Sequence, residues 1–357
     1  MSISDVVAAL MFLGVVAYAI FGGADFGSGV WDLVAGDAKQ GAHLRAQIDR
    51  SLGPVWEANH VWLIYVLVFL WTGFPEAFAA IMNTLFVPWM FVGLGIVLRG
   101  GAFAFRKFSS TLLEARLHGA VFAASSLITP FFLGMIAGAI ASGRVPIDGT
   151  GDLWASWTGP TSWIGGVLAV LTCTFLAGTF LAADAERSGN TDLAEEIGRN
   201  TLVAGAITGG AALTAAVTLK LDAESLASGL YGRGLALIII SAVAGSLSLV
   251  RLRQQRWARA RVGAVVAVAA IVIGWGVGQY PDLLVDEITI SDAAGARPTL
   301  IGLIIVFGLA AVTVVPSLAW LYVLVNGTRW STADQVVPTI SSANTWTELI
   351  RSKSAPS

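Results

Sequence analysis

Long apolar runs alternate with short polar stretches over almost the whole chain. A hydrocarbon core about 30 Å thick is crossed by a helix of roughly 20 apolar residues. Nine runs have about that length, at residues 6–29, 52–71, 77–98, 117–141, 163–183, 201–219, 235–250, 262–279 and 300–325. The pattern predicts an all-α polytopic membrane protein with nine transmembrane helices.

The basic residues gather on alternate connections between these runs. The first, third, fifth and seventh connections and the C-terminal tail hold 3, 4, 2, 5 and 3 Lys or Arg residues, which is 17 of the 21 in the chain. Cytoplasmic loops carry an excess of Lys and Arg in membrane proteins. We therefore expect the N-terminus outside the cell and the C-terminus in the cytoplasm.

Composition supports a membrane protein, because 56% of residues are hydrophobic and only 12% are charged. A soluble catalytic domain or a nucleic-acid-binding surface is not expected from this composition. The first basic residue is Lys39, so the N-terminus lacks the basic start of a signal peptide and the first run is expected to stay in the mature chain. The single cysteine, Cys173, rules out an internal disulfide.

No connection is long enough to form a separate domain, which predicts one transmembrane domain over 1–330 and a polar tail over 331–357. The first and fifth runs both end in Ala-Asp, at Asp25 and Asp184. This similarity suggests pseudo-repeats over 1–141 and 162–280, hence two four-helix bundles with the helix at 300–325 added.

Three ionisable residues fall within or near the first two predicted helices. Asp25 lies near the end of the first run, and Glu57 and His60 lie early in the second. The spacing of Glu57 and His60 puts them on one helical face, and antiparallel pairing of the two helices brings Asp25 to a similar depth. Ionisable residues at membrane depth are costly and mark functional sites.

Two interpretations of this cluster stay open. Carboxylates in a low-dielectric environment and a neighbouring imidazole can pass protons near neutral pH, which describes a proton relay. Alternatively, Asp25 caps a helix end, Glu57 pairs with Arg45 or Arg50, and His60 bonds a carbonyl group. The chain has only two other histidines, His43 and His118, and is poorly equipped to ligate haem by itself.

Two motifs resemble signatures of subunit II of cytochrome bd-type quinol oxidases. They are residues 23–29 (GADFGSG) and 54–64 (PVWEANHVWLI). The likeness continues at residues 103–106 (FAFR), 278–281 (GQYP), 288–294 (ITISDAA) and 298–300 (PTL). It covers essentially the whole chain and includes the nine-helix layout.

This resemblance implies part of a respiratory complex that oxidises membrane quinol, reduces dioxygen to water and draws protons from the cytoplasm. It implies a haem-free subunit paired in a pseudo-symmetric heterodimer with subunit I, which holds two haems b and one haem d. Whether the quinol is ubiquinol or menaquinol stays open, as does the presence of a bound quinone, a lipid or a small accessory membrane subunit.

The resemblance also implies that the acid after the Trp of the second motif, Glu57, belongs to a proton route at the subunit interface. Our hypothesis is that Asp25 and Glu57, tuned by His60 and held by Trp56 and Asn59, carry protons toward the haem site of the partner. No catalytic, cofactor-binding or metal-binding residue is expected in this chain. The rival hypotheses are a secondary transporter and a structural scaffold subunit without a proton role.

Overall fold

The computed structural model describes residues 2–36, 41–52, 56–106 and 111–326. The first half of this chain forms α1 (Ile3–Ala17), a π-helical turn η1 (Tyr18–Gly22), α2 (Gly23–Val34), α3 (Ala42–Leu52), α4 (Trp56–Gly73), α5 (Pro75–Thr84), α6 (Phe86–Arg106) and α7 (Leu112–Ala141). The second half forms α8 (Pro160–Arg187), α9 (Thr191–Asp222), α10 (Glu224–Tyr231), α11 (Leu235–Arg253), α12 (Trp257–Gln279), β1 (Asp282–Leu284), β2 (Ile288–Thr289) and α13 (Arg297–Asn326).

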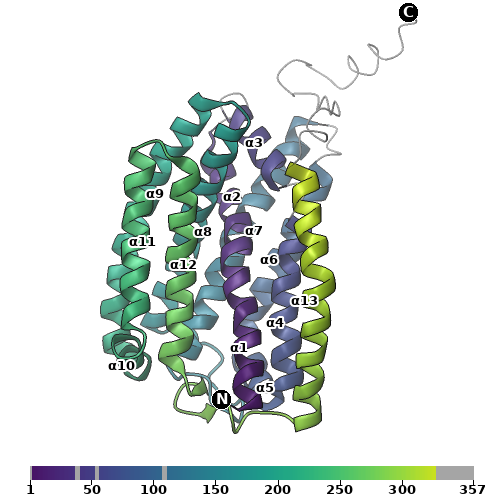
Figure 1. Cartoon of the computed structure of the whole chain (residues 1–357), viewed down its shortest axis with the longest axis vertical. Helices are drawn as coiled ribbons and strands as arrows, with labels where there is room; N and C mark the ends of the chain where they lie inside the picture. Colours follow the sequence, from purple (N-terminus) through teal and green to yellow (C-terminus); the bar gives the residue numbers. More distant parts are fainter. Residues whose placement is uncertain (1, 37–40, 53–55, 107–110, 327–357) are drawn as a thin grey trace, which may run out of the picture.

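The long helices run side by side along the longest axis of the molecule (Figure 1). Within the described ranges, eight helices are long and apolar enough to cross a membrane, and the number is nine when the bent pair α4 and α5 is counted as one span. The start of α1 and the end of α13 lie at opposite ends of the bundle (Figure 1). The predicted all-α polytopic fold is confirmed. The proposed pseudo-repeats over 1–141 and 162–280 stay a prediction, and the predicted tail over 331–357 lies outside the described residues.

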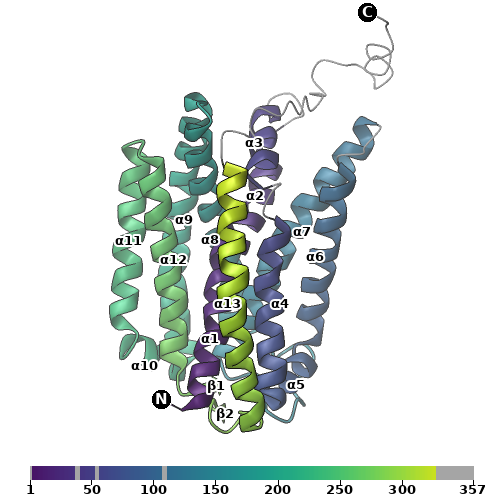
Figure 2. The ribbon, with the colours of Figure 1, turned by 45° about the vertical axis from the view of Figure 1, so that its right-hand side comes forward.

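Two hydrophobic clusters form most of the core. One joins α1 and α2 to α8, α9 and α12 around side chains such as Trp31 and Leu176. The other joins α1 to α4, α5, α6, α7 and α13 around side chains such as Phe74 and Met135. The long first helix therefore contributes to both clusters, and Figure 2 shows it between α12 on one side and α4 on the other.

The third crossing differs from the sequence prediction. The predicted helix at 77–98 is divided between α5 and α6, with a break at Leu85. Proline lacks an N–H and is well accommodated at the first position of a helix, and Pro75 starts α5 there, at 119° to α4. Residues 86–106 consequently form α6, and its apolar length includes Arg99.

The loop between α7 and α8 lies at the end of the bundle where α1 starts. Asp148 accepts hydrogen bonds from the N–H and hydroxyl of Thr150, and Asp152 accepts from the N–H groups of Trp154 and Ala155. These bonds lower the pKa of both carboxyls below the ordinary value. At the same end lies a short hairpin of β1 and β2, which the sequence pattern did not predict (Figure 2).

The opposite end carries α3, the α8–α9 connection and the α11–α12 connection (Figure 1). These segments and the helix ends beside them hold Arg45, Arg50, Arg187, Arg199 and the group of five arginines between Arg251 and Arg261. Most of the described Lys and Arg residues therefore lie toward this end of the bundle. Arg99 differs from its sequence prediction, which counts it in a polar connection, because the structure places it inside α6.

Candidate functional site

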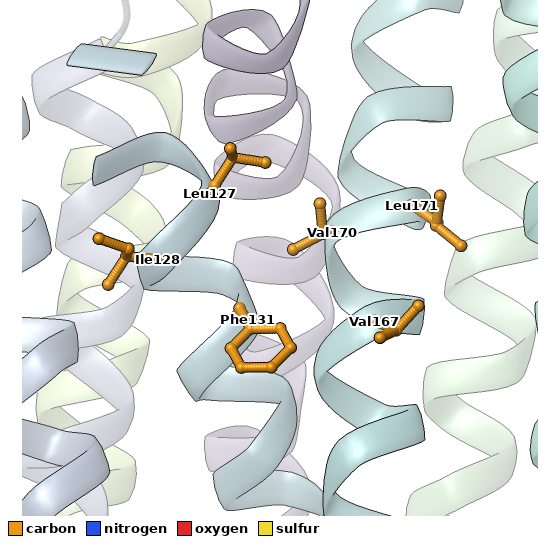
Figure 3. Close-up of a pocket in the computed structure, with 6 residues that line it drawn as sticks. All are labelled: Leu127, Ile128, Phe131, Val167, Val170 and Leu171. Carbon is orange, nitrogen blue, oxygen red and sulfur yellow. The ribbon is translucent and has the colours of Figure 1, made fainter. Parts of the chain in front are cut away.

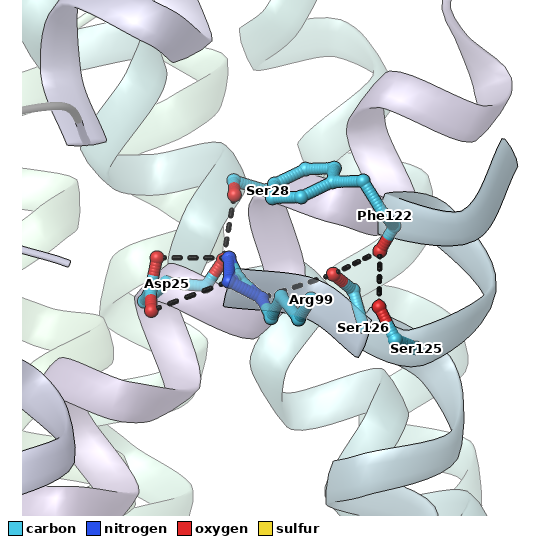
Figure 4. A network of polar contacts seen from close by, with 6 residues as sticks. All are labelled: Asp25, Ser28, Arg99, Phe122, Ser125 and Ser126. Carbon is cyan, nitrogen blue, oxygen red and sulfur yellow. Dashed lines mark hydrogen bonds and ion pairs between the residues drawn. The ribbon is translucent and has the colours of Figure 1, made fainter. Parts of the chain in front are cut away.

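A buried ion pair joins α2 to α6 (Figure 4). The Nη2 atom of Arg99 lies 2.9 Å from Oδ1 of Asp25, and its Nη1 atom lies 3.5 Å from Oδ2. The side chains are 2% and 0% exposed. A charge removed from water in this way is retained only with a partner of opposite sign, and each of these two residues supplies that partner for the other.

Arg99 also has partners besides the Asp25 carboxylate. Its Nη2 atom donates to the backbone carbonyl of Asp25 at 2.8 Å, and its Nε atom donates to the hydroxyl of Ser126 at 3.1 Å. The guanidinium carbon lies 5.0 Å from the ring centre of Phe26 and 4.6 Å from that of Phe122, distances at which aromatic faces attract a cation. The guanidinium is thus held from several sides.

Close helix packing places Asp25 at this depth. Asp25 lies in a helix that is continuous from Ile3 to Val34 through the π-helical turn, so it does not cap a helix end. Two residues beyond it, a Cβ atom at Gly27 would collide with the backbone carbonyl of Cys173 on α8. The absence of a side chain at Gly27 lets the two backbones touch, as small residues do between membrane helices.

The start of α4 brings two predicted residues to the ion pair. Asn59 is 8% exposed, and its side chain is within electrostatic reach of the Asp25 carboxylate. The ring of His60 packs edge-on against Phe26 at an interplanar angle of 66°, with 5.7 Å between ring centres. The Nδ1 atom of His60 is buried without a hydrogen-bond partner in the described part of the chain. The structure thus brings Asn59 and His60 close to Asp25, and the expected cluster of Asp25, Glu57 and His60 stays a prediction.

Glu57 and Trp56 start the same helix, one turn before His60. Their side chains lie outside the part of the chain whose side chains the structure describes. Arg45, considered above as a partner for Glu57, forms an ion pair with Asp32 at 2.6 Å. The roles of Glu57 and Trp56 stay predictions.

The second Ala-Asp pair is in a different setting. Asp184 on α8 lies 3.1 Å from Arg261 on α12 and 3.7 Å from Arg187, and its side chain is 24% exposed. It is close to the end of the bundle that gathers Lys and Arg, and its partners are reached by water. Of the two aspartates, Asp25, with its buried ion pair to Arg99, is therefore the better candidate for a functional role inside the membrane.

An apolar groove of about 320 Å³ is lined by side chains of α7 and α8 on the side of the bundle (Figure 3). Its walls are Leu127, Ile128, Phe131, Val167, Val170 and Leu171. A substrate site needs a few polar groups to orient its ligand, and none of these side chains has one. The groove therefore suits a hydrocarbon chain and offers no means of catalysis.

Together, the fold and the site define a polytopic membrane protein whose ionisable groups are gathered inside the helix bundle. The chain belongs to the family described as cytochrome bd terminal oxidase subunit II, whose sequence model matches residues 3–325. The resemblance found in the sequence motifs is thereby confirmed, and the chain is a multi-pass respiratory protein of the bacterial cytoplasmic membrane.

Individual relatives agree with this family. The chain is 29% identical over 171 residues to cytochrome bd ubiquinol oxidase subunit 2 of Bacillus subtilis (strain 168), which is 47% of this chain and 48% of the relative. The chain thus matches about half the length of that curated relative. In fold, it resembles a chain of the bd oxidase from Geobacillus thermodenitrificans with a TM-score of 0.76 and 22% identity, covering 91% of this chain and 98% of the other.

The family name raises the question of haem. A haem iron needs a ligand such as an imidazole, a thiolate or a thioether. His43 is exposed on α3, His118 is stacked on Phe105, and the ring of His60 is packed against Phe26 and Tyr18. The three histidines thus lie in separate settings, and among the described residues no group of three His, Cys, Asp or Glu side chains could hold a metal ion.

Proposed function

We propose that this chain is the haem-free second subunit of a quinol-oxidising, dioxygen-reducing complex, paired with a haem-bearing subunit I. Membership of the cytochrome bd subunit II family supports this assignment, and the curated relative from Bacillus subtilis carries a quinol oxidase in its name. In the complex, subunit I holds haem b and haem d and performs the redox chemistry. The chain described here supports that partner from within the membrane.

We further propose that the chain contributes a path for proton uptake through Glu57, His60 and Asp25. The supporting observation is the ionisable cluster around Asp25, which lies at membrane depth with a side chain that is 0% exposed. The path starts at the end of the bundle that gathers Lys and Arg, which we place in the cytoplasm. Glu57 stands nearest that end on α4, and His60 follows one turn later. The ring of His60 packs against Phe26, the neighbour of Asp25 on α2.

The contacts of Arg99 make Asp25 a workable carrier. If the carboxylate accepts a proton, the guanidinium keeps its hydrogen bonds to the Asp25 carbonyl and to Ser126, together with its two aromatic faces. The cation then has no counter-charge, but these remaining contacts lower the energetic cost of keeping it buried. When the proton leaves, the ion pair forms again.

Two measurements test the assignment. First, the chain is affinity-tagged, extracted in mild detergent and examined by its reduced-minus-oxidised visible spectrum and by what co-purifies. Haem b and haem d bands with a larger haem-bearing partner are expected. A colourless protein that purifies alone would contradict membership of the complex and favour a transporter.

Second, oxygen consumption with quinol is measured for Glu57→Gln and Glu57→Asp in the assembled complex. Glu57→Gln removes the acid and should slow turnover, whereas Glu57→Asp keeps the acid with a shorter reach and should retain more activity. Glu76→Gln is the matched control, because Glu76 is an exposed acid on α5 at the opposite end of the bundle. Full turnover of an assembled Glu57→Gln complex would refute the relay, and lost assembly in both Glu57 variants would indicate a scaffold role.

A further inference from the structure

Tyr18 is a buried polar residue for which the proposed path has no role so far. It stands at the middle of the continuous helix Ile3–Val34, where the π-helical turn begins. Its hydroxyl oxygen is buried and has no hydrogen-bond partner in the described part of the chain. An unsatisfied buried hydroxyl is energetically unfavourable, and π-helical turns within long helices are frequent at functional sites.

The surroundings of Tyr18 are those of the ionisable cluster. The centre of its ring lies 6.4 Å from that of His60 and 6.2 Å from that of Phe26. Its hydroxyl is within electrostatic reach of Asp25 and Arg99. His60 has a buried Nδ1 atom that also lacks a partner. Two unsatisfied polar atoms on neighbouring rings therefore lie beside the buried ion pair.

The π-helical turn and Gly22 determine where the Tyr18 ring lies. Gly22 ends the π-helical turn, and a Cβ atom there would lie 2.7 Å from the edge of the Tyr18 ring, closer than real Cβ atoms come. Only glycine leaves room for the ring to lie along the turn in this way. The turn and Gly22 together direct the hydroxyl into the cluster and away from the lipid.

We propose that Tyr18 is a relay residue that extends the path from His60 toward the middle of the membrane. The hydroxyl accepts a proton on its oxygen from the His60 side and releases its own proton onward, so the residue ends unchanged and no oxidant or reductant is needed. A hydroxyl can do this because it is both a donor and an acceptor. This inference rests on the proton path proposed above.

The test compares Tyr18→Phe with Tyr65→Phe in the complete oxidase complex. Tyr65 on α4 donates its hydroxyl to the carbonyl of Leu10 at 2.8 Å, so its hydroxyl has a structural partner. Tyr18→Phe should leave the unfolding temperature unchanged or raise it, since no hydrogen bond is lost. It should lower the rate of oxygen consumption roughly tenfold or more and increase the solvent deuterium isotope effect, because a proton transfer then limits turnover.

The control should behave in the opposite way. Tyr65→Phe loses a hydrogen bond and should lower the unfolding temperature, while turnover and isotope effect stay normal. Gly22→Ala displaces the Tyr18 ring and should reproduce the slow turnover of Tyr18→Phe.

Each other outcome is decisive. If Tyr18→Phe turns over normally while Glu57→Gln is slow, the role of Tyr18 is refuted and the path through Glu57 stands. Normal turnover in both variants refutes the path itself. If Tyr18→Phe unfolds as early as Tyr65→Phe and loses turnover only in proportion to lost haem absorbance, Tyr18 is a packing residue and the inference is overturned.

Discussion

Arg99 on α6 holds the carboxylate of Asp25 on α2 at 2.9 Å, across 74 residues of sequence and in a region closed to water. The contact gives α6 a fixed partner on the first long helix. It also sets the electrostatic character of the cluster that Asn59 and His60 complete, because a positive and a negative charge stand together there.

Removing Arg99 alone should be costly. Arg99→Met leaves the Asp25 carboxylate buried without its cation, and breaking a buried pair in this way costs about 3–5 kcal/mol. We expect poor assembly or a clearly lower unfolding temperature, measured on the purified complex. Adding Asp25→Asn to the same chain removes the unpaired charge and should recover part of the loss. Wild-type stability in Arg99→Met alone would mean that the ion pair contributes nothing.

A substitution at His60 can test its packing role and its proposed proton-transfer role separately. His60→Phe keeps a ring against Phe26 and removes the unsatisfied Nδ1 atom, so the unfolding temperature should be unchanged or higher. Oxygen consumption should nevertheless fall, because a titrating group is lost from the proposed path. His43→Gln, at an exposed position on α3, is the control and should turn over normally. Normal oxygen consumption in His60→Phe would remove His60 from the path.

Gly27 should tolerate no side chain. Gly27→Ala places a methyl group against the backbone carbonyl of Cys173, which cannot move aside as a flexible side chain would. Overpacking of this kind typically costs about 1–3 kcal/mol, and a lower unfolding temperature is expected. Gly210→Ala on α9 is the matched control, because nothing lies within 4 Å of its added Cβ. Equal stability of the two variants would contradict the close approach of α2 and α8.

Asp222 should matter for stability and not for turnover. It accepts from Arg144 at 3.0 Å and from the N–H and hydroxyl of Thr161, and thereby joins the end of α9 to the start of α8 and to the loop before it. The hydrogen bond between Arg144 and Asp222 also raises the pKa of the Arg144 guanidinium above its ordinary value. Because both side chains are partly exposed, Asp222→Asn should cost only about 1 kcal/mol.

The check for Asp222→Asn is a thermal unfolding curve beside an oxygen-consumption assay. Glu195→Gln, an exposed acid on the same helix, should change neither. A fall in turnover at unchanged stability would assign Asp222 a function that its contacts do not suggest.

Much of this fold was predictable because hydrocarbon thickness fixes the length of apolar runs. The clustering of Asp25 with Asn59 and His60 was also predictable, since consecutive helices of a bundle are antiparallel neighbours. Arg99 was missed for a specific reason. Placing the third helix at 77–98 put Arg99 just outside it, although apolar residues continue beyond it as far as Phe105.

Pro75 carries the signal that places these helices differently. Proline at a first helical position predicts a new helix, and a new helix at 75 shifts the next crossing toward Arg99. The π-helical turn at Tyr18 had no comparable signal. It depends on how the Tyr18 ring packs between α2 and α4, and such packing is a property of the assembled bundle.

The pairing of Asp25 with Arg99 has an electrical consequence. A lone charge moved across a membrane under 100 mV gains or loses about 2.3 kcal/mol, whereas a closely spaced pair of opposite charges carries no net charge for the potential to act on. At rest the cluster is therefore nearly indifferent to membrane voltage. A proton that reaches the cluster adds one net charge partway across the membrane potential. Protonation is therefore the step whose free energy depends on voltage, whereas the unprotonated cluster depends on it little.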